Sequence, residues 1–344
     1  MHIVVTGGAG FIGSHFVKHV LGGAYPAFRA ARVTVLDKFT YAGSGTNLSD
    51  VTDHPLLTIE KGDICDGPLV DRLLADSDLV VHFAAESHVD RSIAAADVFV
   101  RTNVIGTHRL LEAALKAQLT RFVCISTDEV YGSIGGTGRW DERAPLAPNS
   151  PYSASKASSD LLALAYYRTH GLPVCVTRCS NTYGSYQHPE KVIPRFVTQL
   201  LQGHRVPLYG DGSHVRDWLH VNDHCQGVAL VAADGRPGQV YNIGGGTELT
   251  NRDLTQHILA LFGADWSRVD NVPDRKGHDL RYALTTDRIS GELGYRPAVP
   301  FEDGLARTVA WYTRHPEWWK PLRAVDTYQG VARLREAQEP LPPP

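Results

Sequence analysis

Tyr152 and Lys156 are the clearest candidates in this sequence for residues that do chemistry. They stand four positions apart in the segment SPYSASK. Ser150 suits a helix N-cap and Pro151 suits a first helical turn, so the segment predicts a helix that begins here. In a helix this spacing places the phenol and the ammonium on one face. The ammonium would lower the pKa of the tyrosine, which could then act as a general base toward a hydroxyl.

A second candidate group is the segment STDEVYG, in which Thr127 offers a hydroxyl and Asp128 and Glu129 are adjacent carboxyls. The segment follows the predicted strand 121–126 and therefore stands at the carboxyl edge of a sheet, where ligands of open α/β folds bind. Two loop carboxyls are often only solvated. Beside a tyrosine base they could serve as acid and base in an elimination, provided that one is protonated and the other ionised.

A glycine-rich turn, TGGAGFIG, indicates where a dinucleotide would bind. Gly7, Gly10 and Gly13 follow the predicted strand 2–6 and open the predicted helix 12–21. Glycines permit a tight turn and let the backbone approach a pyrophosphate at the helix N-terminus. The turn alone is a weak motif, and its position between a strand and a helix strengthens it.

Asp37 closes the next predicted strand, VTVLD. An acidic residue here can bind both ribose hydroxyls of the adenosine and would repel a 2′-phosphate. The sequence therefore favours NAD over NADP, although the neighbouring Lys38 weakens this preference. Asp63 follows the third strand and is a further adenine-side candidate, with a solvated surface turn as the alternative.

Short apolar segments alternate with amphipathic stretches through the first half of the chain, which is typical of a parallel sheet with crossover helices. The strands are almost wholly apolar, so both faces of the sheet should be covered. We therefore expect an α/β fold, a doubly wound parallel-sheet NAD-binding Rossmann domain with a smaller α/β substrate domain. The predicted strands are 2–6, 33–36, 56–59, 79–83, 121–126 and 173–178, and the predicted helices are 12–21, 68–75, 100–117 and 151–170.

The alternation ends after about residue 180, where Tyr, Pro, Gly and His become frequent. Later elements are expected at 222–234 (helix), 239–243 (strand) and 250–262 (helix). The expected division is a Rossmann domain over 1–181, to which 218–241 returns, and a substrate domain over 182–217 and 242–320. Residues 336–344 are expected to form a frayed tail.

Composition excludes several classes of protein. The 344 residues are 43% hydrophobic and 21% charged with a net charge of −3, which is ordinary for a globular protein and does not favour nucleic-acid binding. No apolar run approaches the ~18 residues of a membrane span, and no secretion signal is expected. Five cysteines without a C-x-x-C pair predict reduced thiols and a cytoplasmic protein. The histidines lack metal-binding spacing, so no metal is expected.

Nine segments together resemble the dTDP-glucose 4,6-dehydratases of the extended short-chain dehydrogenase/reductase family. They are TGGAGFIGSH, LDKFTYAG, HFAAESHVDRSI, STDEVYG, YSASK, RCSNTYG, YQHPEKVIPR, YGDGSHVRDWLHVNDH and DRKGHDLRYAL. The resemblance extends from Met1 to about Trp319. TYAG, HVDRSI, TDE and HPEK are much more specific than the glycine turn.

The resemblance implies two sets of binding residues, and the second would meet a sugar nucleotide whose diphosphate needs convergent cations. The implied NAD contacts, besides the three glycines, are Phe11, Ile12, Asp37, Lys38, Phe39, Thr40, Asp63, Ile64, Phe83, Ala84, Ala85, Glu86, Ser87, Thr102, Tyr152 and Lys156. The implied substrate contacts are Ser87, Thr127, Asn181, Lys191, Val192, Arg195, Phe196, Pro207, Tyr209, Arg216, Asn251, Arg275 and His278.

The implied reaction is the conversion of dTDP-glucose to dTDP-4-keto-6-deoxyglucose in deoxysugar biosynthesis. Tyr152 would take the O4 proton while hydride passes from C4 to NAD, helped by Thr127. Glu129 would remove the C5 proton, Asp128 would protonate the departing C6 hydroxyl, and the hydride would return to C6. The alternatives are a dehydratase of another nucleotide sugar, a sugar-nucleotide 4-epimerase, which needs no acid–base pair at 128–129, and a non-catalytic NAD-binding regulator.

The resemblance also implies a homodimer formed through helices 100–117 and 151–170, and the second helix is apolar around much of its circumference. Three residues depart from the family's pattern: Thr182 replaces an Asn, Ser185 replaces a Pro, and Ser44 replaces an Asn. These departures could loosen a contact with NAD, and none of them touches the five implied catalytic residues.

Overall fold

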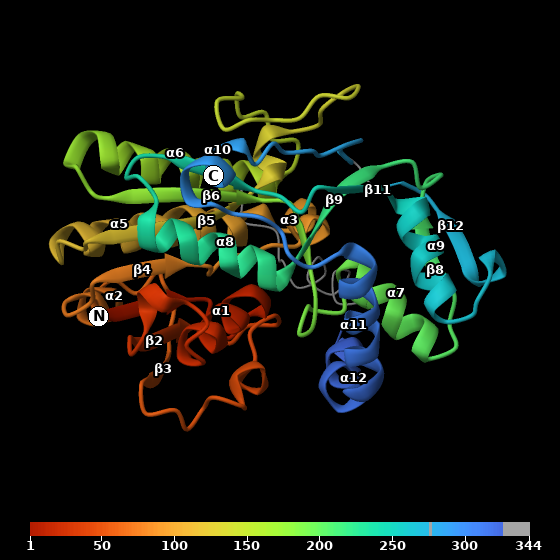
Figure 1. Cartoon of the computed structure of the whole chain (residues 1–344), viewed down its shortest axis with the longest axis horizontal. Coiled ribbons are helices and arrows are strands. Elements are labelled where there is room, and N and C mark those ends of the chain that lie inside the picture. Colours follow the sequence, from red (N-terminus) through yellow and green to blue (C-terminus); the bar gives the residue numbers. More distant parts are fainter. Residues whose placement is uncertain (275–276, 326–344) are drawn as a thin grey trace, which may run out of the picture.

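A seven-stranded parallel sheet forms the centre of the molecule, seen here in a computed structural model that describes residues 1–274 and 277–325 (Figure 1). Its strands follow the order β10-β6-β5-β4-β1-β2-β3, so the strand order reverses between β1 and β4. Ligands of doubly wound sheets bind at such a reversal, beyond the carboxyl ends of the strands. The strands are β1 His2–Thr6, β2 Arg32–Asp37, β3 Leu57–Lys61, β4 Leu79–His82, β5 Arg121–Thr127, β6 Val174–Cys179 and β10 Val240–Ile243.

Helices cover both faces of this sheet (Figure 1). On one face, α1 Phe11–Leu21 packs against α8 Val221–Asp234, with α10 Asp287–Leu293 beside α8. On the other face lie α2 Gly67–Leu74, α5 Thr107–Lys116 and α6 Pro151–His170. The predicted fold class, a doubly wound α/β Rossmann fold, is confirmed.

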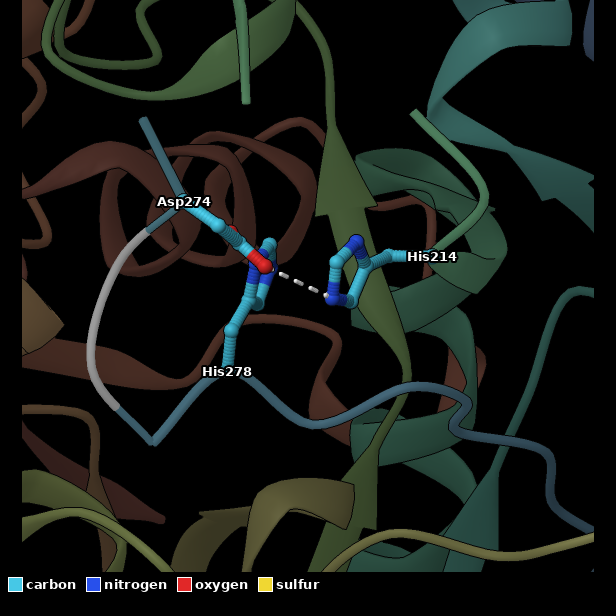
Figure 2. A group of neighbouring side chains, drawn as sticks. All are labelled: His214, Asp274 and His278. Atoms are coloured by element: carbon cyan, nitrogen blue, oxygen red, sulfur yellow. Dashed lines mark hydrogen bonds and ion pairs between the residues drawn. The ribbon is translucent and has the colours of Figure 1, made fainter. Parts of the chain in front are cut away.

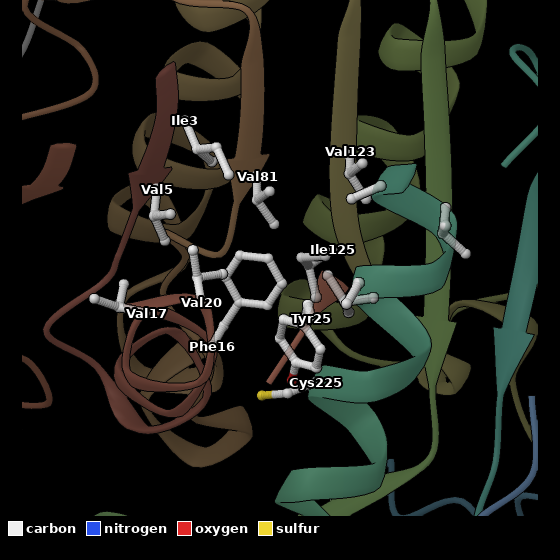
Figure 3. Packing of buried hydrophobic residues seen from close by; sticks show 14 of the residues in the cluster. Ile3, Val5, Phe16, Val17, Val20, Tyr25, Val81, Val123, Ile125 and Cys225 are labelled. Atoms are coloured by element: carbon white, nitrogen blue, oxygen red, sulfur yellow. The ribbon is translucent and has the colours of Figure 1, made fainter. Parts of the chain in front are cut away.

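The core on the α1 face is formed by strand side chains and the two helices. Figure 3 shows Phe16 and Val20 of α1 beside the strand residues Val5 and Val81, with Cys225 of α8 next to Tyr25. All of these side chains are buried. This packing fixes the start of α1, and with it the glycine turn that joins β1 to α1.

The second half of the chain adds a smaller set of elements with its own apolar core. A three-stranded sheet has the order β11-β9-β7, and a two-stranded sheet pairs β12 with β8. The strands are β7 Asn181–Tyr183, β8 Val206–Tyr209, β9 Val215–His220, β11 Thr247–Thr250 and β12 Val269–Val272. The helices are α7 Val192–Leu201, α9 Asn251–Leu261, α11 Phe301–Arg314 and α12 Pro316–Val325.

The first-half strands and helices lie within about two residues of their predicted bounds. The predicted helix 100–117 differs in detail, because residues Val100–Gly106 are π-helical and α5 begins at Thr107. Two short helices, α3 Val89–Ala94 and α4 Ala96–Phe99, precede it. Strand β10 pairs with β6, so the large sheet extends to Ile243, two residues beyond the predicted return segment 218–241. The domain division as a whole stays a prediction.

No helix in the described ranges 1–274 and 277–325 combines the length and the apolar character that a membrane span requires.

Candidate active site

A cavity of about 440 Å³ opens at the carboxyl ends of the large sheet, at the reversal between β1 and β4. It brings together most of the residues that the sequence singled out. The predicted residues that line it are Gly7, Gly10, Phe11, Ile12, Gly13, Asp37, Lys38, Thr40, Asp63, Ile64, Phe83, Ala84, Ala85, Ser87, Thr102, Thr127, Asp128, Glu129, Tyr152, Lys156, Asn181 and Lys191.

The glycine turn has no room for side chains. Gly7 has a φ of +69°, and a Cβ there would lie 2.6 Å from the backbone nitrogen of Ala84. A Cβ on Gly13 would lie 2.3 Å from the carbonyl oxygen of Gly7. Among the described residues, no side chain caps the N-terminus of α1. The helix start is therefore a backbone cradle of the kind that binds a pyrophosphate.

Asp37 is held in place at the end of β2 by two backbone groups. Its Oδ2 accepts a hydrogen bond from Ala9 N at 2.9 Å, and its Oδ1 accepts one from Phe39 N at 2.8 Å. Burial raises the pKa of this carboxyl, and the two hydrogen bonds oppose that rise. The carboxyl lines the cavity, as a ribose-binding acid must. Phe39, a predicted NAD contact, does not line the cavity and packs its ring against the core of the α1 face.

Lys38 and Asp63 form an ion pair with an Nζ–Oδ2 distance of 2.7 Å. Lys38 is largely exposed, so the pair contributes little to stability, typically ~0.2–1 kcal/mol. Its geometric effect is larger, because it joins the loop after β2 to the loop after β3 at one side of the cavity.

The start of α6 positions Tyr152 and Lys156 as the sequence predicted. Ser150 and Ser153 form a reciprocal capping box, and Pro151 occupies the first turn. Lys156 is buried, and its Nζ donates a hydrogen bond to the carbonyl oxygen of Ile125 at 2.6 Å. The ammonium is thereby fixed against the end of β5, beside the segment that carries Thr127.

The acidity of Tyr152 differs from the prediction. Burial raises its pKa well above the ordinary value, and the charges of Glu129 and other groups add to this rise, while a hydrogen bond with Thr127 opposes it. The expected lowering of this pKa by Lys156 is therefore wrong. The physical reason is that burial disfavours the charged phenolate and the neighbouring acidic groups disfavour it further.

Asp128 is a buried carboxyl whose surroundings favour the protonated form. The side chain is 2% exposed, and burial raises its pKa well above the usual value, with Glu129 and Asp217 adding to the effect and Arg216 opposing it. Thr127 Oγ1 lies 3.2 Å from Oδ1 of this carboxyl. Glu129 is less buried. The neighbouring carboxyls therefore occupy different environments, the condition for dividing acid and base roles between them.

Four buried polar atoms around the cavity suit a polar ligand. Within the described part of the chain they have no hydrogen-bond partner, and all belong to cavity-lining residues. They are Ser126 Oγ, Asp128 Oδ2, Asn181 Oδ1 and Gln187 Oε1. Buried polar groups normally have partners, so these atoms together with the glycine cradle fit a bound nucleotide such as NAD.

Among the described residues, the remaining predicted substrate contacts do not line this cavity and lie in the smaller part of the molecule. Arg216 is buried, donates to the carbonyl of Asp279 at 2.9 Å, and lies 4.4 Å from the ring centroid of Tyr282. Phe196 packs in the core of the smaller part, so its side chain is structural. Arg275 lies outside the described residues. The others are Val192 and Arg195 on α7, Pro207 and Tyr209 on β8, Asn251 on α9, and His278.

His278 belongs to a cluster with His214 and Asp274 (Figure 2). The carboxyl of Asp274 lies 2.7 Å from Nδ1 of His278 and 3.3 Å from Nε2 of His214. The three offer atoms that could bind a metal ion, but the imidazole rings are stacked at 3.7 Å with an interplanar angle of 14°. A metal binds in the plane of an imidazole ring, so two stacked rings cannot share one ion in this arrangement.

The three residues that depart from the family's pattern all have partners. The hydroxyl of Thr182 lies 3.0 Å from Nδ1 of the buried His224, and that of Ser185 lies 3.1 Å from Nε2 of His15. The side chain of Ser44 caps a short 3₁₀ helix by accepting from Thr46 N. Of the three, only Thr182 lines the cavity.

Several cavity residues were not predicted. Some, such as Ile125 and Ser126, adjoin predicted positions on the same strand. Others lie inside the quoted segments RCSNTYG and YQHPEK, so these segments, and not the residue types, could have indicated them. Glu86 lies within the predicted NAD contacts 83–87 and also lines the cavity. The unpredicted lining residues are Leu36, Ala42, Gly43, Gly62, Val98, Ile125, Ser126, Cys179, Ser180, Thr182, Gln187, His188 and Glu190.

This strand order, with a glycine turn after β1 and a Tyr–Lys pair on α6 in one cavity, defines a dinucleotide-binding protein of the extended short-chain dehydrogenase/reductase class. The chain belongs to the GDP-mannose 4,6 dehydratase family, whose sequence profile matches residues 4–308. It is 61% identical over 324 residues to a dTDP-glucose 4,6-dehydratase of Streptomyces antibioticus, an alignment that covers 94% of this chain and 96% of that protein. The resemblance inferred from the sequence motifs is confirmed.

Solved structures also show that the chain is similar to dTDP-glucose 4,6-dehydratases. DesIV, a dTDP-glucose 4,6-dehydratase from Streptomyces venezuelae with NAD and TYD bound, is 61% identical with a TM-score of 0.92, covering 94% of this chain and 100% of that one. The NAD complex of the UDP-glucose 4-epimerase of Thermus thermophilus is 31% identical with a TM-score of 0.83, covering 91% and 99%. The fold is thus shared by dehydratases and epimerases, and the site must distinguish them.

Proposed function

We propose that the chain catalyses the NAD-dependent dehydration of dTDP-glucose to dTDP-4-keto-6-deoxyglucose in deoxysugar biosynthesis. The observation that carries this proposal is the pair Asp128 and Glu129 in the same cavity as Tyr152, with Asp128 more deeply buried than Glu129 and its pKa raised by that burial. An elimination of water needs one acid and one base, and this pair supplies both. The identity to dTDP-glucose 4,6-dehydratases supports the same conclusion.

NAD is the cofactor, and when bound it accepts a hydride from C4 of the sugar and returns it to C6. The glycine turn would hold its pyrophosphate, and Asp37 would bind the adenosine ribose. Related dehydratase structures contain NAD. The residues of this chain are therefore assigned to binding, orientation and proton transfer.

Tyr152 receives the proton of the O4 hydroxyl, and Thr127 lies beside it to orient the sugar. The resulting C4 ketone acidifies C5, from which Glu129 removes a proton. Asp128 donates its proton to the departing C6 hydroxyl, which leaves as water. Lys156 is positioned to balance the negative charge that develops on the phenol, because its ammonium is fixed at Ile125.

The acid pair argues against a 4-epimerase. Epimerisation requires oxidation and reduction at C4 only, so a buried carboxyl with a raised pKa next to a less buried carboxyl would have no use in that reaction. A dehydratase of another nucleotide sugar uses the same chemistry, and only the substrate distinguishes it.

The product spectrum with a panel of nucleotide sugars tests the proposal. We expect turnover of dTDP-glucose far above that of UDP-glucose or GDP-mannose, without added reductant, and a 4-keto sugar that absorbs in alkali. Equal or better turnover of another nucleotide sugar would overturn the dTDP assignment, and a C4-inverted product would indicate an epimerase.

The chain is further proposed to act as a cytoplasmic homodimer. Five free cysteines, four of them buried, support a reducing compartment.

Large apolar side chains are exposed on the π-helical segment and on α6, which pack against each other: Val100 is 49% exposed, Ile105 47% and Leu161 57%. In the proposed domain division, the large sheet binds NAD and the smaller part binds the sugar nucleotide.

A further inference from the structure

Three of the sequence segments most specific to this family, TYAG, HVDRSI and HPEK, meet in one cluster of side chains. Tyr41 comes from the loop after β2, Arg91 from α3, and Glu190 from the loop before α7. The guanidinium carbon of Arg91 lies 3.9 Å from the ring centroid of Tyr41, and its Nε donates to Glu190 Oε2 at 3.0 Å. None of these three side chains has a role in the proton transfers described above. We call this group the clasp.

Neighbouring groups reinforce the clasp. The ring of His188 packs edge-on against Tyr41 with centroids 5.5 Å apart, and burial lowers the pKa of this histidine to about 4, so it is neutral at pH 7. The hydroxyl of Tyr41 is hydrogen-bonded to Glu86. Glu190 is almost fully buried, so its ion pair with Arg91 is shielded from solvent and is worth more than a surface pair.

The clasp joins the loops that surround the cofactor side of the cavity. Thr40, Ala42 and Gly43 of the first loop line the cavity, as do Glu86 and Ser87 before α3. The third loop contributes a further set: Gln187, His188, Glu190 and Lys191. Breaking the contact of Arg91 with either partner would therefore release a cavity wall without removing any group proposed to touch the reacting sugar.

The proposed reaction explains why the loops around the cavity would need to be held together. The hydride taken from C4 must be returned to C6 of the same sugar, so a cofactor that left between the two steps would strand an oxidised intermediate. We propose that Tyr41, Arg91 and Glu190 are positioning residues that hold the loops around the cavity together and so keep NAD bound through the whole cycle. This purpose rests on the proposed function, whereas the effect on NAD release can be measured without any sugar.

The test compares NAD release from the wild type, Arg91→Met, Tyr41→Leu and the double variant. Each protein is loaded with labelled NAD and chased with unlabelled NAD. Each single variant should release NAD about tenfold faster, the scale expected for losing a partly buried cation–π contact or a charge-assisted hydrogen bond. Because the two residues act through one contact, the double variant should also be about tenfold faster, and not a hundredfold.

Two controls separate retention from general damage. Tyr41→Phe keeps the ring under the guanidinium and should retain most of the wild-type behaviour. Arg72→Met removes an exposed ion pair with Glu60, away from the cavity, and should leave NAD release unchanged. The rise in unfolding temperature produced by added NAD, measured against each variant's own value without NAD, should shrink in the clasp variants and stay at the wild-type size in Arg72→Met.

In turnover, the clasp variants should lose activity as free NADH and an unreduced keto sugar appear in solution. Added NAD can reload the enzyme only for a new oxidation, so reduction of the stranded sugar should require added NADH. Unchanged release rates in both single variants, or a hundredfold effect in the double variant, would overturn the clasp. If the wild type retains NAD through the clasp but does not turn over dTDP-glucose, the proposed function fails and the clasp stands.

Discussion

At the residue scale, Tyr152 and Asp128 have their acidities shifted in the same direction by burial but are needed for opposite tasks. A raised pKa suits Asp128, which must arrive at the elimination step with its proton. The same upward shift is unfavourable for Tyr152, because it disfavours the phenolate form that accepts a proton. The positive charge of the nicotinamide ring of bound NAD and the ammonium of Lys156 are the groups that can lower the pKa of Tyr152 for that step.

Replacing Tyr152 by Phe tests this role directly. The variant keeps the ring and its packing but loses the phenol, so binding of NAD and nucleotide sugar should survive. Hydride transfer should fall by the ~10²–10⁴-fold that is typical of lost general acid–base catalysis. Stopped-flow absorbance of NADH measures the step, and near-normal transfer would assign O4 deprotonation to another group.

Variants that lack one or the other carboxyl should stall at different steps of the reaction. Glu129→Gln preserves size but cannot take a proton at neutral pH. With enzyme in excess over dTDP-glucose, we expect NADH absorbance to rise and persist, with little deuterium entering C5 from heavy water. Asp128→Asn leaves the base intact, so C5 should exchange while loss of the C6 hydroxyl is slow.

The opposite isotope behaviour of two neighbouring variants is the expected signature, and NMR of the recovered sugar measures it. Full dehydration in both variants, or loss of the first hydride transfer in both with binding intact, would contradict the acid and base assignments.

At the element scale, the start of α6 determines where the reactive side chains lie. Ser150→Ala removes one half of the capping box and should destabilise the protein by ~0.5–2 kcal/mol, measured by urea unfolding. Because Tyr152 is in the first turn, kcat should fall as well. Ser158→Ala is the matched control, since its hydroxyl donates to Ala154 O within the same helix, and it should be close to neutral. Equal effects of the two substitutions would argue against the cap.

The elements of the first half could be predicted because their patterns are local. Apolar strands such as 2–6 and a capped helix such as 151–170 carry their own boundaries. The short strands of the smaller part, including β7 with three residues, have no pattern of their own and depend on pairing with distant segments. The π-helical turn at Val100–Gly106 is likewise a product of packing, since the sequence predicts a continuous helix there.

At the scale of the whole molecule, the motifs identified the reactive residues but not their environment. Tyr152 and Lys156 are neighbours in the sequence and could be paired by spacing. The pKa of Tyr152 depends on burial beneath segments that only the folded chain brings together, so the direction of its shift could not be predicted from spacing. The contacts of the clasp could not be predicted from spacing either, because long stretches of chain separate Tyr41, Arg91 and Glu190.

The apolar surface of α6 and the adjoining π-helical segment leads to the last prediction. Burying side chains as exposed as Leu161, Val100 and Ile105 would remove substantial apolar area from water, which is favourable by ~25 cal/mol per Å². Sedimentation at micromolar concentration should therefore give about twice the chain mass of 37.7 kDa. Leu161→Glu places a charge in the proposed interface and should shift the protein to a monomer. Leu261→Glu changes another exposed leucine, on α9, and should leave the dimer intact. A wild-type monomer, or equal dissociation by both substitutions, would mean that α6 is not the dimer interface.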